Sequence, residues 1–145
     1  TDPEAAAIVF ASGVPLKMAG LDVTHQFQAT PDRVDAIDAI GSPLATVLAD
    51  ALRFFSGTYR GRTDPGALAG APMHDVLAVL ALTHPQLFRT SRHHVAVETA
   101  GELTRGMTVI DERHLIDRPE PNCTVLDAVD AAGAFEVLRA AIAHR

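Results

Sequence analysis

Cysteine and clustered positive charge are scarce in this 145-residue sequence, and each scarcity narrows the class of protein. Cys123 is the only cysteine, so an intrachain disulfide is impossible and nothing indicates an oxidising compartment. The 12 Lys and Arg residues are scattered and the formal net charge is -6. Because binding to a phosphate backbone needs clustered basic side chains, we expect no binding to a nucleic-acid polymer. From the cysteine content we expect a cytoplasmic protein.

Long apolar runs are absent as well. The longest, such as residues 76–82, are far shorter than the roughly 20 residues that span a bilayer, and no basic segment followed by an apolar one opens the chain. We therefore expect no membrane association. Since 48% of the residues are hydrophobic, the chain can bury a core, and one globular domain over residues 1–145 is the default expectation.

The patterns that are present alternate between helix and strand, which indicates an α/β fold. Helical spacing of apolar residues predicts helices at residues 3–12, 31–40, 43–55, 75–82 and 131–144. Alternating or buried runs predict strands at residues 16–23, 94–98, 107–111 and 123–129, and residues 88–92 lead into the second of these. The strands at 94–98 and 107–111 should form a small β-hairpin. Asp2 and Pro3 open the first helix as though another segment led into it, so we take the chain to be a fragment or a processed product.

Residues 56–72 break the periodicity and are rich in Gly and Pro, with Tyr59, Arg60 and Arg62 among them. Long irregular segments are commonly functional lids or disordered segments. We expect this segment to be a mobile active-site loop.

His74 and Asp75 follow that loop and open a buried helix. Asp is a favoured helix cap, and on local pattern alone this interpretation is preferred. The alternative is functional: the Asp75 carboxylate is a hard ligand for Ca²⁺, while the His74 imidazole donates a hydrogen bond or a proton in a cleft. Asp22 and His25, at the end of a predicted strand, are interpreted as turn or cap residues in preference to a site.

The other candidates have simpler interpretations. His93 and His94 are adjacent on a strand and point to opposite faces, so a surface pair is preferred over a metal site. Charges beside a hairpin turn, such as Glu98 and Arg105, are usually solvated. Cys123 has no basic neighbour in sequence and is expected to be a small core residue.

Four segments, in order, resemble the C-terminal half of the inosine-uridine preferring nucleoside hydrolases, and the likeness covers nearly the whole chain. They are Thr1-Asp2-Pro3-Glu4-Ala5-Ala6 through Val14-Pro15-Leu16, Gly20-Leu21-Asp22-Val23-Thr24-His25, Gly70-Ala71-Pro72-Met73-His74-Asp75 and Gly101-Glu102-Leu103-Thr104-Arg105-Gly106-Met107-Thr108. The resemblance implies a nucleoside-hydrolase-like α/β fold with a mostly parallel sheet flanked by helices. It implies hydrolysis of the ribonucleoside N-glycosidic bond to free base and ribose, a reaction of purine and pyrimidine salvage.

The resemblance also assigns residues. Asp75 corresponds to a late carboxylate that completes a Ca²⁺ shell, and His74 to the adjacent histidine near sugar and base, a leaving-group acid or base contact. Tyr59 lies in a stretch that resembles the mobile segment closing over the base, and is expected to bind substrate. The Leu21 to His25 and Thr104 to Gly106 segments are expected to be structural. A Ca²⁺-bound water would be the nucleophile, as charge develops on the ribose.

The family's aspartate-rich N-terminal motif and its Glu-Phe-Asn segment are missing from this sequence. We expect the N-terminal half of the same protein to complete the site, and homo-oligomers to form. The isolated chain should have no hydrolase activity. It should also be either tightly associated with other chains or poorly stable. Two alternatives stay open: a non-catalytic α/β binding or interaction module that keeps the scaffold, and an unrelated α/β domain in which His74-Asp75 is only a cap.

Overall fold

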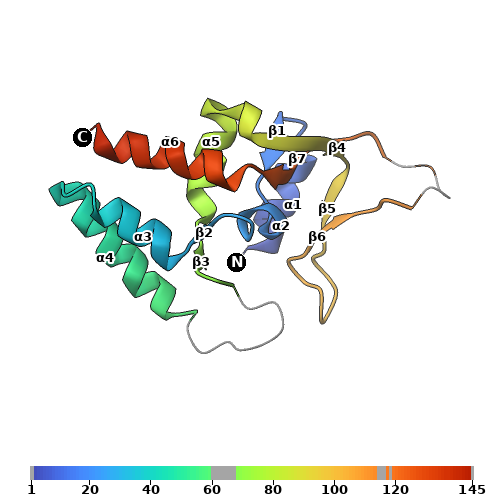
Figure 1. The fold of residues 1–145 in the computed structure, drawn as a ribbon. Coiled ribbons are helices and arrows are strands. Elements are labelled where there is room, and N and C mark those ends of the chain that lie inside the picture. The colour runs from blue at the N-terminus through green and yellow to red at the C-terminus, as the bar shows by residue number, and fades with distance from the viewer. Residues whose placement is uncertain (1, 60–67, 114–116, 118, 145) are drawn as a thin grey trace. The chain divides into compact units, whose positions relative to one another are not determined.

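A computed structural model describes residues 2–59, 68–113, 117 and 119–144 (Figure 1). These residues gather into two compact units where one was expected. Unit 1 comprises Thr1–Met18 and Thr90–Leu126, and unit 2 comprises Ala19–Arg89 and Asp127–Arg145. Among the described residues, no helix has both the length and the apolar character needed to cross a membrane.

Unit 1 is built on a helix and a hairpin. Helix α1 (Pro3–Ala11) begins where the Asp2 carboxylate accepts a hydrogen bond from the Ala5 amide at 2.9 Å, which confirms the predicted cap. It packs against β5 (Val95–Val97), which pairs antiparallel with β6 (Thr108–Ile110) and confirms the predicted hairpin. The buried side chains of this unit's core are Val95, Cys123 and Val125.

Three strands, β1 (Leu16–Met18), β7 (Cys123–Val129) and β4 (Phe88–His93), form a sheet in the order β1-β7-β4. Strand β1 runs parallel to β7, with Leu16 opposite Cys123. Hydrogen bonds from the Asn122 amide to the His93 carbonyl and from the Asp130 amide to the Leu87 carbonyl show that β4 runs antiparallel to β7.

The expectation of a mostly parallel sheet is therefore met by the β1–β7 pair alone among the ladders described. A parallel pair needs a long crossover between its strands, and the chain from β1 to β7 supplies one. The hairpin β5–β6 and the pair β2 (Gln28–Ala29) with β3 (Ala71–Pro72) are antiparallel.

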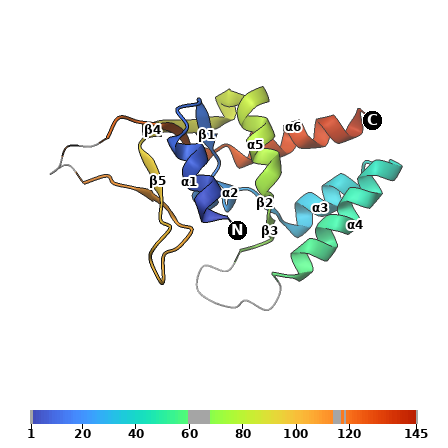
Figure 2. The same ribbon diagram turned by 180° about the vertical axis from the view of Figure 1, so that it is seen from behind.

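Unit 2 is mainly helical, with the 3₁₀ turn η1 (Pro85–Leu87) and four longer helices: α3 (Pro31–Asp38), α4 (Pro43–Gly57), α5 (His74–Thr83) and α6 (Ala131–Ala143). Helices α3 and α4 lie side by side in both ribbon views (Figures 1 and 2). Apolar side chains from these helices and from β2 form one core that includes Phe27, Ile37, Leu77 and Phe135. The predicted helices are thus confirmed, with ends shifted by two residues at most.

Arg33 connects β2 to the start of α6. Its guanidinium donates hydrogen bonds to the carbonyls of Gln28 and Ala131, at 2.9 and 3.0 Å, and lies over the rings of Phe27 and Phe135. A charged fork that satisfies two carbonyls and contacts two rings holds these elements in register.

The predicted strand at residues 16–23 is wrong in its second half. It ends at Met18, and Leu21–Thr24 forms the short helix α2. Gly20, with extended backbone angles, precedes the helical turn, which leaves Leu21 63% exposed and buries Val23 and Thr24. A continuous buried strand would not expose a leucine in this way.

The loop predicted at residues 56–72 is described only in part. Ser56 and Gly57 end α4, and Ala71–Pro72 forms β3. Residues 60–67, including Arg60 and Arg62, lie outside the described residues. The mobility of this segment stays a prediction.

Candidate active site

His74 is fixed in place by the short ladder that precedes it. Strands β2 and β3 pair antiparallel, and the Met73 amide donates to the Phe27 carbonyl at 2.9 Å, so the chain enters α5 at a defined angle. The approach of the two strands requires glycine at position 70. A Cβ there would meet the Ala29 carbonyl group and lie 2.8 Å from the Thr30 amide nitrogen.

The His74 imidazole is half-buried and held from one side. Its Nδ1 atom lies 2.8 Å from the Thr24 hydroxyl oxygen, and Thr24 is only 2% exposed. The ring of His25 lies 6.0 Å away, centroid to centroid, at a tilt of 56°. The Nε2 atom of His74 forms no hydrogen bond with any described residue, which leaves it available to a ligand.

Asp75 is exposed at the second position of α5. The cap residue of this helix is Met73, and no side chain caps it. Within the described part of the chain the Asp75 carboxylate makes no hydrogen bond or ion pair, so the interpretation as a cap is wrong. Its charge lies at the positive end of the helix dipole, where a carboxylate is favourable.

An apolar groove of about 490 Å³ opens beside this pair. The residues that line it come from α3, α4, α5 and α6 and the segment before α5: Ile37, Leu48, Leu52, Phe55, Pro72, Met73, His74, Asp75, Val76, Leu138 and Ile142. Concave apolar sites with a few polar groups are typical of small-molecule binding. His74 and Asp75 are the polar groups of this groove.

The described residues do not form a calcium site by themselves. No three His, Cys, Asp or Glu side chains among them gather closely enough to hold a metal ion. Calcium takes six to eight oxygen ligands, and the Asp75 carboxylate supplies two at most. The donor set of the described residues therefore does not fit Ca²⁺ without further ligands.

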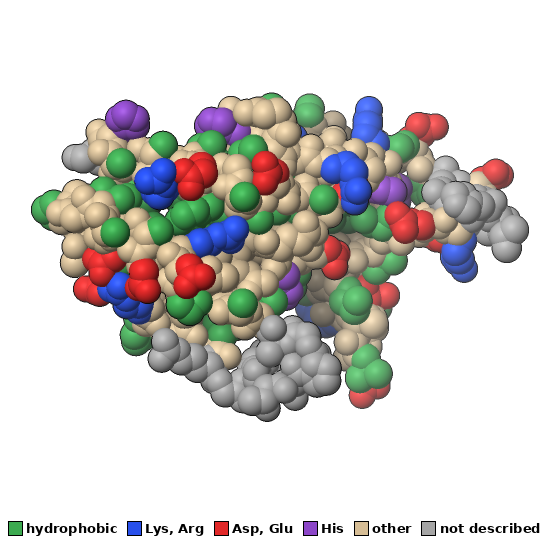
Figure 3. Space-filling view, in the orientation of Figure 1, with side chains coloured by type: hydrophobic (Ala, Val, Ile, Leu, Met, Phe, Trp, Pro, Cys, Tyr) green, Lys and Arg blue, Asp and Glu red, His purple; other side chains and the backbone are tan. Residues whose placement is uncertain are grey.

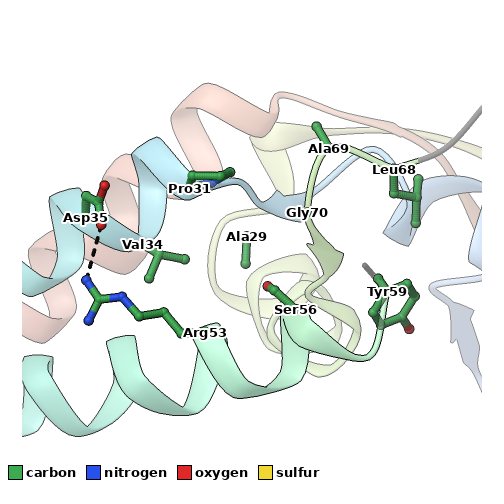
Figure 4. Close-up of a pocket in the computed structure, with 10 residues that line it drawn as sticks. All are labelled: Ala29, Pro31, Val34, Asp35, Arg53, Ser56, Tyr59, Leu68, Ala69 and Gly70. Atoms are coloured by element: carbon green, nitrogen blue, oxygen red, sulfur yellow. Dashed lines mark hydrogen bonds and ion pairs between the residues drawn. The ribbon is translucent and has the colours of Figure 1, made fainter. Parts of the chain in front are cut away.

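Tyr59 follows the C-terminal end of α4 and packs edge-to-face on Phe55, with ring centroids 5.4 Å apart. It lines a second pocket, of about 310 Å³, together with Arg53 and Gly70 (Figure 4). His74 does not line that pocket, so the structure does not bring Tyr59 and His74 into one cavity.

The same pocket carries a cluster of charges. Arg53 pairs with Asp35 and Asp38 at 3.2 and 2.8 Å, and the first of these pairs is drawn in Figure 4. The hydrogen bonds that the Arg53 guanidinium donates to these carboxylates, to Asp38 first, raise its pKa. Both terminal nitrogens of this arginine are paired with neighbouring acids.

The remaining candidates have structural roles. His93 ends β4, and His94 lies between β4 and β5, so they are not neighbours on one strand as predicted. They bond different partners, the Ser91 hydroxyl and the Glu120 carbonyl, although both line one pocket. The Glu98 carboxylate accepts hydrogen bonds from the amides of Ala100 and Gly101.

Arg105 forms an ion pair with Glu4 at 2.6 Å. Burial raises the pKa of the Cys123 thiol, which is 2% exposed, and this confirms it as a core residue.

Thr24 is the site residue that sequence reasoning missed. The sequence predicts a purely structural role for its segment, and its partner His74 is 50 residues away. The signal that could have found it is the pairing of two motifs, Thr24-His25 and His74-Asp75, each with a polar residue at the edge of a buried element.

Comparisons with known proteins identify the family to which the chain belongs. The family pattern of the inosine-uridine preferring nucleoside hydrolases matches residues 1–136. The chain is 44% identical over 137 residues to the pyrimidine-specific ribonucleoside hydrolase RihA of Shigella boydii, covering 94% of this chain and 43% of that protein. It is 43% identical to RihA of Escherichia coli O1:K1 over the same length.

Solved structures give the same result. A purine-preferring ribonucleoside hydrolase from Gardnerella vaginalis superposes with a TM-score of 0.83 and 32% identity, over 99% of this chain and 44% of that one. A plant nucleoside hydrolase, 23% identical, shares the fold with a TM-score of 0.86, over 99% of this chain and 46% of that one. The chain thus spans less than half the length of these relatives. An unrelated α/β domain is excluded, and the chain belongs to the inosine-uridine preferring nucleoside hydrolase family.

Proposed function

We propose that this chain supplies the His74 side of a nucleoside hydrolase site, and that the complete protein hydrolyses the N-glycosidic bond of ribonucleosides to free base and ribose. The observation that carries the proposal is the His74 imidazole, bonded through Nδ1 to a buried hydroxyl beside an apolar groove, in a chain of this family. We take the chain to correspond to the C-terminal half of the family's fold.

The proposed reaction breaks the bond between ribose C1′ and the base nitrogen. A water oxygen bonds to C1′ and loses one proton to a base or to solvent outside the described residues. The C1′–N bond breaks with its electron pair on the departing base, which takes one proton. When the His74 ring carries a proton on both nitrogens, its Nε2–H group is placed to give that proton, because Nδ1–H is engaged by Thr24 and Nε2 is not bonded within the described residues. Proton donation of this kind typically contributes 10²- to 10⁴-fold in rate.

Asp75 is proposed as one oxygen ligand of a calcium ion whose other ligands lie outside the described residues. The support is its exposed carboxylate, which has no partner in the described chain. When bound, such an ion would lower the pKa of a water and orient the ribose hydroxyls.

A non-catalytic binding module is the second candidate. It is favoured by one observation, the lack of a metal-binding group among the described residues. Such a module would keep the groove beside His74 and have no turnover in any context.

A chimera separates the two candidates. In it, this chain replaces the matching segment of Escherichia coli RihA, which is 43% identical over 137 residues. Release of uracil from uridine and of hypoxanthine from inosine is followed with excess Ca²⁺. We expect turnover of at least one substrate, and no base release from a chimera that binds nucleosides normally would establish the non-catalytic module.

The 145-residue chain alone is the matched control. We expect no base release from it under the same conditions, because its described residues cannot hold the metal. Clear turnover by the isolated chain would show that the site is complete within this sequence.

A further inference from the structure

We propose that Thr24 is the positioning residue of His74: its hydroxyl sets the ring orientation and places the imidazole proton on Nδ1, so that Nε2 faces the ligand. The proposal rests on the function proposed for His74 and deepens it.

The Thr24 hydroxyl is buried. Thr24 is 2% exposed, and a buried hydroxyl without partners costs free energy. Its partners in the described chain are the Leu21 carbonyl, at 3.5 Å, and Nδ1 of His74, at 2.8 Å. These two bonds satisfy the hydroxyl within unit 2.

The two bonds differ in direction. The Leu21 carbonyl can only accept, so a Thr24 hydroxyl that bonds both partners gives its single proton to Leu21. The hydroxyl oxygen then accepts from His74, which requires the proton on Nδ1. In a neutral imidazole the bond made by one nitrogen decides the state of the other, so Nε2 is left as the free nitrogen.

The support of this hydroxyl is rigid. Thr24 belongs to α2, and the Gln26 side chain that follows it bonds the carbonyls of Asp22 and Asp127 and the Val129 amide. These bonds attach the end of α2 to the β7 segment of unit 2. A hydroxyl held in this way fixes the imidazole instead of following it.

The chain offers a matched control on the same helix. At the other end of α5 the Thr83 hydroxyl lies 2.9 Å from Nδ1 of His84, in an exposed pair of the same chemistry. Thr83→Val therefore removes an equivalent bond that does not concern the groove.

The test is the tautomer of His74, read from ¹⁵N shifts and two-bond couplings of the imidazole in the 145-residue chain while the ring is neutral. The His74→Asn variant assigns the signals. We expect the Nδ1–H form in the unmodified chain and in Thr24→Ser, and a shift toward Nε2–H in Thr24→Val. Thr83→Val should leave the His74 signals unchanged. An Nε2–H form in the unmodified chain, or equal spectra of Thr24→Ser and Thr24→Val, would overturn the proposal.

The RihA chimera gives the kinetic readout. Thr24→Val should lower kcat by roughly 10- to 100-fold with little change in KM, and Thr24→Ser should restore it. Equal kcat values for the two variants would also contradict the proposal. If the unmodified chimera has no activity, the proposed function fails, and the tautomer measurement still decides the role of Thr24.

Discussion

Asp75 and His74 are adjacent, but the folded structure constrains them differently. The imidazole is held by Thr24, whereas the exposed carboxylate is held by nothing in the described chain. Asp75→Asn should therefore abolish base release by the chimera while changing the free energy of unfolding of the chain by about 1 kcal/mol at most, the helix-dipole contribution. Thermal unfolding and base release measured on matched samples check this. A large loss of stability with activity retained would show that Asp75 is structural.

Gly70 is the residue on which the entry to α5 depends. In Gly70→Ala the added methyl group would meet the Ala29 carbonyl group, and the β2–β3 pair would have to separate. We expect a loss of about 1–3 kcal/mol in denaturant unfolding, as for other overpacked sites. Gly57→Ala is the control, because a Cβ there meets nothing within 4 Å. Equal stability of the two variants would mean that the strands are not held as described.

At the scale of elements, the stability of the β5–β6 hairpin should depend on pH through Glu98, which lies in the turn between the two strands. Hydrogen bonds from the backbone amides of Ala100 and then Gly101 lower the pKa of Glu98 below its ordinary value of 4.5. A carboxylate whose pKa is lower in the folded state stabilises the fold above the unfolded pKa. That stabilisation is lost as the pH falls through the folded pKa.

Glu98→Gln should therefore lower the Tm of the chain at pH 7, and the difference from the unmodified chain should shrink below pH 4.5. Glu102→Gln is the control, since Glu102 makes no hydrogen bond or ion pair with the described residues. A Tm difference that is constant from pH 7 to pH 3 would refute the turn's dependence on this charge.

The starts of the helices were predictable because capping residues and prolines within a few positions determine them. Pro3, Pro31 and Pro43 each stand at the start of an observed helix, and Asp2 caps the first one. The strand predicted at 123–129 matches β7. A short apolar run without helical spacing typically forms a buried strand. Local patterns of this kind need no knowledge of tertiary contacts.

The rest depended on contacts between distant segments. Helix α2 replaced a predicted strand because burial of Val23 and Thr24 in unit 2 outweighed the strand-like run. The Thr24–His74 hydrogen bond joins residues that are 50 positions apart in the sequence, and no local pattern predicts it. The candidate pair His74-Asp75 was predicted from the sequence, but the Thr24 hydroxyl that holds His74 was not.

At the scale of the whole molecule, large apolar side chains lie on the surface of both units. Phe54 is 83% and Leu82 74% exposed in unit 2, and Ile8 is 72% exposed in unit 1. Figure 3 shows one face on which hydrophobic side chains lie between scattered charged ones. Large exposed apolar side chains are candidates for burial in an interface, which accords with a chain that spans less than half the length of its relatives.

The isolated chain should therefore self-associate, as the proposed homo-oligomer and the proposed completing half both require buried surfaces. In sedimentation velocity the average mass of the sedimenting species should rise with protein concentration. The Phe54→Ser substitution should reduce this self-association. Ala140→Ser, an exposed change on α6, is the control. A monomer at every concentration with one cooperative unfolding transition would contradict the proposal that the chain is half of a fold.

The role of His74 is tested most directly by base release from the RihA chimera carrying His74→Ala, compared with the same chimera carrying His84→Ala. Both histidines belong to the α5 region, and each bonds a threonine through Nδ1, but only His74 lines the groove. We predict that His74→Ala lowers kcat by roughly 100-fold or more while His84→Ala leaves it unchanged. Equal rates in the two variants would contradict the assignment of His74 to the reaction.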